Sequence, residues 1–312
     1  MTAHDPRLLQ ALLRQDLYRF VMKAFATVSP GEPFLPNWHL MAICYHLELV
    51  RQGKIKRLRI EVPPRSLKSV CASVAFPAFF LGHDPTAKII TASYSADLAA
   101  KHAGDCRAVM QAQWYRELFP NTRISPAKNQ EANYETTKRG YRYATSVGGT
   151  LTGRGGNLII IDDPLKPEDA MSQTKREAVN GWYSRTLLSR LNNKANDAII
   201  LVQQRLHMDD LAGYVDALDD CTTMVSMVPI STKSNVLQIP MLVYGRKNSN
   251  MPGLALISGT ESFKYSKPIN KIPKPRMNSA NCLSLSLLAN NNGNDTPITI
   301  NEMDVIFTLK PK

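Results

Sequence analysis

The stretch that decides the fold is Arg59–Val70, which reads RIEVPPRSLKSV. A phosphate-binding loop is written G-x-x-x-x-G-K-S/T, and it follows a strand and opens a helix. Lys68 and Ser69 match the last two positions of that pattern, but Val62 and Leu67 stand where the pattern has glycine. The stretch alone therefore leaves two interpretations open: a phosphate loop without its glycines, and an ordinary turn between a strand and a helix.

The flanking sequence has the form that a phosphate loop requires. Residues 56–62 carry apolar side chains at alternate positions, which predicts a short strand. Residues 68–81 are expected to be helical, with a kink or an early end at Pro77. The N–H groups at the start of a helix point at a bound anion. The two prolines of the turn have no N–H, so the cradle would begin at Arg65, whose guanidinium suits a bidentate phosphate contact. Lys68 would then reach the β- and γ-phosphates, and the Ser69 hydroxyl would bind Mg²⁺.

A second motif, Leu158–Pro164, reads LIIIDDP and is an apolar strand that ends in two carboxylates. Acids at the carboxyl end of a buried strand suit Mg²⁺ coordination by the first and activation of water by the second. We therefore predict Asp162 as the metal-side residue and Asp163 as the catalytic base. The alternative is structural, because Asp-Asp-Pro also suits turns and helix N-caps. The Lys-Ser pair upstream favours the functional interpretation.

Two further polar segments are candidates for the same site. Ser146–Asn157 is rich in glycine and could be a mobile loop that presents Arg154 to a phosphate; a plain flexible connection is the alternative. This loop precedes a strand, so the dinucleotide-binding fingerprint does not apply. Gln203–Arg205 directly follows an apolar strand, and Gln204 is placed to sense the γ-phosphate and couple it to motion. Simple termination of the strand is the alternative for that segment.

Strand and helix patterns alternate along the first two thirds of the chain. This alternation predicts an α/β fold with a mostly parallel sheet covered by helices on both faces. Two helices are expected before the first strand, over residues 6–26 and 38–51. The expected strands are 56–62, 87–95, 157–162 and 197–202.

The composition limits the classes of protein. Of the 312 residues, 44% are hydrophobic and 21% charged, as in ordinary globular proteins. The net charge of +12 suggests a polyanionic partner, with nucleic acid first and a solvated basic surface as the alternative. Five widely spaced cysteines without a C-x-x-C pattern indicate reduced thiols in a cytoplasm. The longest apolar run is too short to span a bilayer, and we expect no membrane segment.

The sequence changes character near residue 216. Residues 221–312 contain no histidine or tryptophan, are rich in asparagine and lysine, and show no sustained periodicity. A frameshift or a recombination junction would explain the change, which would make the gene a prophage remnant. The alternative is a divergent C-terminal domain whose pattern we do not recognise.

Several separated motifs, taken in order, resemble the large subunit of tailed-phage terminases, the motors that package DNA. The resemblance covers about residues 6–215 and implies a P-loop NTPase of the ASCE type. In that family P-P-R-x-x-K-S is an accepted phosphate loop, although the position before the lysine is usually glycine. Leu67 lacks glycine's freedom at positive φ and could crowd the phosphates, which would impair turnover. The motifs are PNWH (36–39), VPPRSLKS (62–69), ASYS (92–95), ATSVGGTLTGRGGN (144–157), IIIDDP (159–164) and QRLHMDDLAG (204–213).

The resemblance implies ATP and Mg²⁺ as cofactors and gives each candidate residue a role. Ser69 and Asp162 would bind the magnesium, and Asp163 would activate water in place of the usual glutamate. Gln204 lies where such motors couple hydrolysis to movement, and Arg154 would act as an arginine finger in a neighbouring subunit. The residues that would bind the nucleotide are Arg65, Ser66, Leu67 and Lys68 of the loop, with Trp38 and His39 on the adenine side.

The resemblance also predicts the organisation and function of the chain. Residues 1–55 would form an N-terminal helical, adenine-side segment, 56–216 the ATPase core, and 217–312 a non-matching tail that is disordered or frameshifted. The predicted function is ATP-driven packaging of double-stranded DNA in the cytoplasm of a bacterial host. The partners would be DNA, a small terminase subunit, a portal protein and further copies in a ring. We find no nuclease domain and expect no endonuclease activity. The alternatives are an inactive prophage remnant that binds only nucleotide or DNA, and a helicase-like ATPase.

Overall fold

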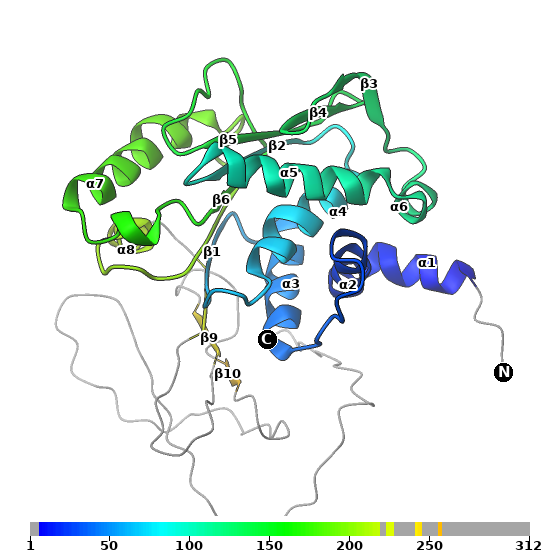
Figure 1. Ribbon diagram of the computed structural model, residues 1–312, viewed down its shortest axis with the longest axis horizontal. Coiled ribbons are helices and arrows are strands. Elements are labelled where there is room, and N and C mark those ends of the chain that lie inside the picture. The colour runs from blue at the N-terminus through cyan, green and yellow to red at the C-terminus, as the bar shows by residue number, and fades with distance from the viewer. Residues whose placement is uncertain (1–5, 219–222, 228–240, 245–254, 258–312) are drawn as a thin grey trace, which may run out of the picture. The chain divides into compact units, whose positions relative to one another are not determined.

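A computed structural model describes residues 6–218, 223–227, 241–244 and 255–257 (Figure 1). The contacts of the chain divide it into two units, Met1–Val228 with Met241–Ala255, and Pro229–Pro240 with Leu256–Lys312. The first unit contains almost all of the described residues, and the fold below is that of this unit.

The first unit is built on one mixed β-sheet. Its strands follow the order β9-β8-β1-β7-β6-β2-β5-β4-β3. The strands from β8 to β5 pair in parallel, whereas β9, β4 and β3 add antiparallel strands at the two ends. The strands are β1 Arg57–Glu61, β2 Lys88–Ser93, β3 Ile124–Asn129, β4 Asn133–Thr136, β5 Tyr141–Ser146, β6 Leu158–Asp162, β7 Ala198–Gln203, β8 Thr223–Met227 and β9 Met241–Tyr244, with β10 at Ala255–Ile257.

Helices cover both faces of this sheet (Figure 1). One face packs against α7, η3 and α8 through a cluster that includes Ile159, Ile161 and Leu201 of the strands and Trp182 and Leu211 of the helices. The other face packs against α3, α5 and η1. The helical segments are α1 Pro6–Gln15, α2 Leu17–Val28, α3 Trp38–Arg51, η1 Val70–Ala75, α4 Phe76–His83, α5 Ala96–Gln111, α6 Gln113–Leu118, η2 Pro167–Asp169, α7 Gln173–Trp182, η3 Tyr183–Leu187, η4 Leu188–Arg190 and α8 Leu211–Ala217.

This architecture confirms the predicted α/β fold with a mostly parallel sheet. The four expected strands are present as β1, β2, β6 and β7. Every residue of β6 is buried, as a strand covered on both faces should be. The sequence analysis missed β3, β4 and β5, because these strands mix charged and apolar residues and β3 contains Pro126. Proline in a sheet is confined to edges and bulges, and β3 is the terminal strand on its side of the order above.

Two of the expected helices are interrupted. The single helix expected over 6–26 is α1 followed by α2, because Asp16 ends the first and caps the second by accepting the N–H groups of Tyr18 and Arg19. The helix expected over 68–81 is a π-helical turn, η1, that continues into α4. Pro77 lies in the first turn of α4, where a missing N–H is tolerated, so the helical run continues to His83.

The sheet continues beyond residue 216. β8 pairs in parallel with β1, and β9 pairs with β8, so these strands belong to the same unit as the predicted core. Most of the predicted tail, including all of 258–312, lies outside the described residues. The domain boundaries and the frameshift therefore stay predictions.

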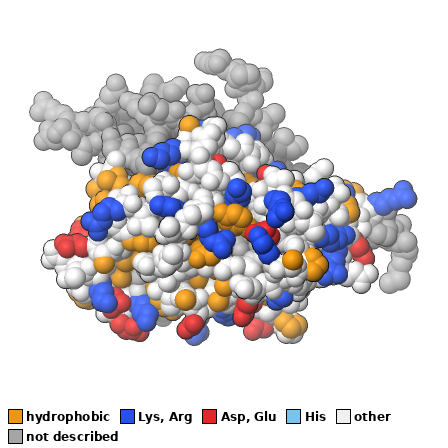
Figure 2. Space-filling model, turned by 90° about the horizontal axis from the view of Figure 1, so that it is seen from above, with side chains coloured by type: hydrophobic (Ala, Val, Ile, Leu, Met, Phe, Trp, Pro, Cys, Tyr) orange, Lys and Arg blue, Asp and Glu red, His pale blue; other side chains and the backbone are white. Residues whose placement is uncertain are grey.

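Charged side chains are unevenly distributed on one face of the described chain. On the face shown in Figure 2, Lys and Arg side chains gather across the middle, and most Asp and Glu side chains lie along the lower margin. Among the described residues, none of the helices has the length and apolar character needed to cross a bilayer.

Candidate active site

The carboxyl ends of the parallel strands bring the two sequence motifs to the same edge of the sheet. Glu61, the last residue of β1, pairs in register with Gln203 of β7, and Val202 pairs with Asp162 of β6. The loop that follows β1 therefore lies two strands away from the aspartate pair that ends β6. Ligands bind at this edge in open α/β sheets.

Side chains of the two motifs are in direct contact. The Ser69 hydroxyl donates a hydrogen bond to Oδ1 of Asp162 at 3.1 Å. The Lys68 ammonium lies 3.0 Å from Oδ1 of Asp163. Lys68 and Asp162 are both buried, with 5% and 1% of their surfaces exposed. A lysine, a hydroxyl and two carboxylates thus meet in a partly buried site.

The loop before Lys68 has an unusual backbone. Arg65 and Leu67 adopt φ values of 60° and 57°, in the left-handed region that glycine prefers. Leu67 therefore adopts the conformation for which the phosphate-loop pattern has glycine. Left-handed residues in a tight turn make neighbouring N–H groups converge into a concave anion-binding nest. The Ser66 hydroxyl stabilises this turn by donating to the Pro63 carbonyl at 2.7 Å.

Ser73 is a site residue that the sequence analysis missed. Its buried hydroxyl donates to Oδ2 of Asp162 at 2.6 Å, so both oxygens of that carboxylate accept a serine hydroxyl. Ser73 lies four residues after Ser69 on the π-helical turn η1, and its carbonyl accepts the guanidinium of the fully buried Arg142 at 3.0 Å. π-Helical turns are frequent at functional sites. A hydroxyl one helical turn after the Lys-Ser pair was the signal available in the sequence.

Burial changes the charge state of the groups around Asp162. It raises the pKa of Asp162 to about 6, the charge of Asp163 adds to this, and hydrogen bonds from Ser73 and Ser69 oppose it. Asp162 is still mostly ionised at pH 7. The ring of His102 on α5 lies 3.5 Å from Oδ2 of Asp162. Burial, helped by the charge of Arg142, lowers the pKa of His102 to about 4, so the ring is neutral and the contact is not an ion pair.

Asp163 differs from Asp162 in conformation and exposure. Its φ of 44° lies in the left-handed region, and 27% of its side chain is exposed. Besides Lys68, its Oδ1 atom accepts the backbone N–H of Gln204 at 3.2 Å. Gln204 therefore reaches the candidate site through its backbone, and the loop after β7 is attached to the predicted catalytic base.

A charged cluster continues from this loop to the strand that leads into the phosphate loop. Arg205 lies 3.5 Å from Glu61 and 3.2 Å from Asp210, the N-cap residue of α8. Glu61 also pairs with Arg59 at 2.8 Å. Burial raises the pKa of Glu61, and the charges of Arg59 and Arg205 oppose that shift. Glu61, like Ser73, was not singled out by the sequence analysis.

The PNWH segment contacts the phosphate loop directly. Asn37 caps α3, and the ring of His39 makes a 3.1 Å hydrogen bond between its Nε2 atom and the carbonyl of Ser66. Burial lowers the pKa of His39. Trp38 is half-buried and packs edge-to-face on His39, with ring centroids 6.1 Å apart. The structure therefore places both predicted adenine-side residues beside the loop.

Arg154 is the candidate that the structure does not bring to the phosphate loop. It is exposed, and its guanidinium lies over the ring of Tyr143, 4.2 Å from the centroid. The ring of Tyr141 is also within reach, at 5.9 Å. These cation–π contacts hold Arg154 against β5. Among the described residues, Arg154 makes no contact with the other predicted site residues, and its action on a neighbouring subunit stays a prediction.

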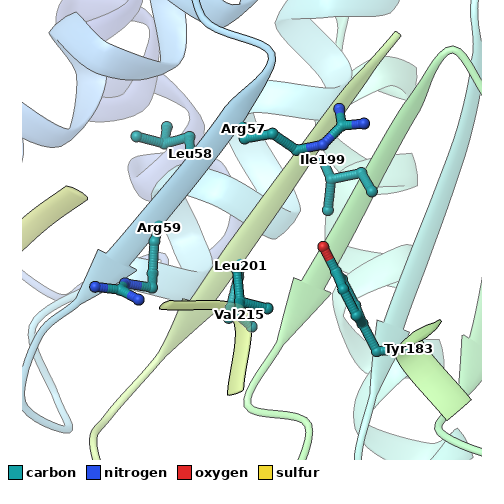
Figure 3. A pocket seen from close by; sticks show the side chains of 7 residues that line it. All are labelled: Arg57, Leu58, Arg59, Tyr183, Ile199, Leu201 and Val215. Carbon is teal, nitrogen blue, oxygen red and sulfur yellow. The ribbon is translucent and has the colours of Figure 1, made fainter. Parts of the chain in front are cut away.

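A small pocket lies elsewhere, beside β1, β7 and α8 (Figure 3). Tyr183 points its hydroxyl toward Ile199, and Leu201 and Val215 lie next to each other (Figure 3). None of the predicted site residues lines this pocket. It is therefore separate from the site formed by Lys68, Ser69 and the aspartate pair.

Comparisons with known proteins give distant structural similarities only. No protein-family model and no curated protein matches the chain. The fold is similar to the crystal structure of the HK97 bacteriophage large terminase, with a TM-score of 0.43 and 15% identity over 72% of this chain and 45% of that chain. It is also similar to an S. cerevisiae dbp5 variant bound to nup159, a gle1 variant, IP6 and ADP, with a TM-score of 0.38 and 11% identity over 66% of this chain and 51% of that chain. The chain thus spans about half of the length of each.

Proposed function

We propose that this chain is an ATPase that uses Mg-ATP hydrolysis to move double-stranded DNA, as its resemblance to terminase large subunits implies. The observation that carries the proposal is the contact between the loop after β1 and the end of β6. Ser69 donates to Asp162, and Lys68 pairs with Asp163. This brings together the groups that phosphoryl transfer needs in P-loop NTPases.

The residues present fit a magnesium nucleotide. Mg²⁺ prefers oxygen ligands and keeps several waters, and Ser69 with Asp162 offers a hydroxyl and an ionised carboxylate. The left-handed turn at Arg65 and Leu67 suits an anion. When bound, ATP supplies the phosphoryl group and Mg²⁺ neutralises its charge.

Lys68 and Asp163 have linked tasks in this proposal. The Lys68 ammonium would hold a phosphate, and the Asp163 carboxylate would accept a proton from the attacking water. In the structure the Lys68 Nζ atom lies 3.0 Å from Oδ1 of Asp163, and the two charges neutralise each other. A phosphate that draws Lys68 away would leave Asp163 paired only with the backbone of Gln204 and able to act as a base. The loop after β7 would follow any movement of Asp163.

The assembly is part of the proposal. DNA packaging would require a ring of copies, a portal protein and a small terminase subunit, in the cytoplasm of a bacterial host. Arg154 would serve as an arginine finger for the neighbouring copy. It is exposed and is held against Tyr143 of β5, and among the described residues it makes no contact with the Arg65–Ser69 loop of the same copy. The net charge of +12 suits a DNA partner.

Steady-state ATP hydrolysis by the purified chain, with and without linear duplex DNA, tests the proposal. Turnover should require Mg²⁺, rise with DNA and disappear in Lys68→Ala. Unchanged turnover in Lys68→Ala would show that the activity is a contaminant's. Nucleotide binding without any turnover, with or without DNA, would instead favour the inactive remnant, for which Leu67 at φ 57° is the motivating observation.

A further inference from the structure

The edge of the sheet opposite the candidate active site is lined with basic side chains. They lie at or just before the first residues of the parallel strands. We call this set the basic edge, and its members are Lys54, Lys56, Lys88, Lys138, Arg139 and Lys194.

The topology places these residues along one line. Because β1, β7, β6, β2 and β5 are adjacent and parallel, their first residues all lie at the same edge. Lys56 precedes β1, Lys194 precedes β7, and Lys88 begins β2. Lys138 and Arg139 form the turn before β5, and that turn is bonded to the β2 side because Gly140 donates to the Pro85 carbonyl.

The basic edge is exposed and has little acid to neutralise it. All six side chains are exposed, and among the described residues none of them pairs with a carboxylate. The Lys56 ammonium donates to the carbonyl of Ala195, next to Lys194. Of the acids in the same turns, Asp197 is buried and accepts Asn157, whereas Asp84 is exposed and accepts the N–H of Thr86.

One of the six residues is held in an uncommon conformation. Arg139 has a φ of 71°, although it is not a glycine, so its backbone at the turn is strained and its side chain is exposed. Strained residues cluster at sites where the strain serves a function. This observation is independent of the number of charges.

We propose that the basic edge binds the phosphate backbone of duplex DNA; the choice of DNA rests on the function proposed above. From β1 to β5 the edge spans four strand intervals, about 19 Å at ~4.8 Å each. Duplex DNA presents one charge per ~1.7 Å of axis, so about eleven phosphates pass over this length. Contacts of this kind are independent of base sequence.

An anionic membrane is the competing partner for such a surface, and the structure favours DNA. Membrane-surface segments combine basic side chains with exposed Trp, Phe or Leu. The exposed large apolar side chains of the described chain, such as Leu35, Met171 and Met208, all lie outside the turns of the basic edge. The edge is also opposite the nucleotide site, so DNA and ATP can bind at the same time.

The test compares two double substitutions that remove equal charge. Lys88→Ala/Lys194→Ala acts on the basic edge, and Lys23→Ala/Lys175→Ala removes exposed cations from α2 and α7. Binding of a labelled duplex of about 30 base pairs is followed by fluorescence anisotropy over a salt series. Melting temperatures check that both variants fold, and Lys88→Arg/Lys194→Arg should bind like the unaltered chain.

The basic-edge variant should bind about tenfold to a hundredfold more weakly at ~0.1 M salt, and its salt slope should fall by about 1.8, or 0.9 per lost contact. The control variant should match the unaltered chain, because charges more than ~10 Å from a phosphate are screened. Equal losses in both variants would overturn the inference, since only net charge would then matter. A loss of binding to phosphatidylcholine–phosphatidylserine vesicles with unchanged DNA binding would overturn it as well.

These outcomes are separable from those of the ATPase test. Normal DNA binding by the basic-edge variant would contradict the proposed DNA surface. Loss of turnover in Lys68→Ala would still support the proposed ATPase activity. Weakened DNA binding by the basic-edge variant would support the proposed DNA surface. Unchanged turnover in Lys68→Ala would at the same time contradict the proposed ATPase activity.

Discussion

Two loops of this molecule need left-handed backbone, and they obtain it with different residues. The phosphate loop uses Arg65 and Leu67, at φ 60° and 57°. The glycine-rich loop between β5 and β6 uses Gly148 and Gly153, at φ 76° and 73°. A left-handed non-glycine residue costs about 1–2 kcal/mol, whereas glycine adopts this conformation freely. Strain is therefore concentrated in the loop that carries the candidate chemistry.

The two loops also differ in what holds them. The phosphate loop is fixed by polar and charged contacts, from His39 to the Ser66 carbonyl and from Lys68 to Asp163. The glycine-rich loop is fixed by aromatic residues of β5, through the Tyr143 hydroxyl on the Thr150 carbonyl and the ring contacts of Arg154. A charged ligand can compete for the first set of contacts and has little effect on the second. The strained loop, which lacks glycine, is therefore the one in which we expect a bound anion to displace existing contacts.

The largest effect is expected from Asp163→Asn. Loss of the base should lower turnover by about 10²–10⁴-fold. ATP binding should become tighter, because the Lys68 ammonium no longer has a carboxylate partner at 3.0 Å. Single-turnover hydrolysis and equilibrium nucleotide titration measure the two effects separately. Weaker ATP binding would contradict the idea that phosphate and Asp163 compete for Lys68.

Ser73→Ala should have the next largest effect. It removes a 2.6 Å hydrogen bond to the Asp162 carboxylate, and bonds to charged groups contribute about 1.5–3 kcal/mol. A less fixed carboxylate should raise the Mg²⁺ concentration for half-maximal turnover by about tenfold, with a smaller effect on the maximal rate. Ser189→Ala, which removes an exposed hydroxyl bonded to Thr186, is the control. An unchanged Mg²⁺ requirement would mean that Ser73 has only a packing role.

A pair of substitutions should give stability changes of opposite sign. Leu67→Gly relieves about 1–2 kcal/mol of strain against about 0.5–1 kcal/mol of added unfolded-state entropy, so stability should rise slightly. Gly148→Ala should destabilise by about 1 kcal/mol, because space is open around the new Cβ and only the backbone conformation opposes it. Urea unfolding measures both. Stability changes of the same sign in the two variants would contradict the idea that strain is present at Leu67 and absent at Gly148.

The smallest effect is expected from Arg154→Ala in the isolated chain. Its cation–π contact is exposed and worth about 0.5–1 kcal/mol. DNA-independent turnover of the monomer should be unchanged, and only turnover in an assembled ring should fall. A mixture of Arg154→Ala and Lys68→Ala chains tests whether Arg154 acts on a neighbouring copy. A Lys68→Ala chain still has Arg154 and can supply it to the intact Lys68 site of an Arg154→Ala neighbour. Loss of monomer turnover would place Arg154 in its own site instead.

The sequence predicted the central strands of the fold and which two motifs lie at the same edge of the sheet, but not the residues that surround Asp162. Strands such as β6 and β7 can be recognised in the sequence, because a strand that is buried on both faces consists of consecutive apolar residues. β5 was missed because it carries Arg142, which is fully buried and bonded to the Ser73 carbonyl. No periodicity of hydrophobic residues marks a buried arginine. The same limit applies to His102, whose proximity to Asp162 depends on how α5 packs.

The outer strand of the sheet, β3, disfavours one kind of association between copies of this chain, namely the addition of a strand from a neighbouring copy. An unpaired strand edge is a template on which another chain can add a strand. β3 carries Pro126 and the charged Lys128, and its register with β4 is shifted between Ile124 and Asn129. Proline, lysine and an irregular register each oppose the addition of a further strand. Addition of a strand from a neighbouring copy is therefore disfavoured along β3, which opposes the growth of fibres from this side of the sheet.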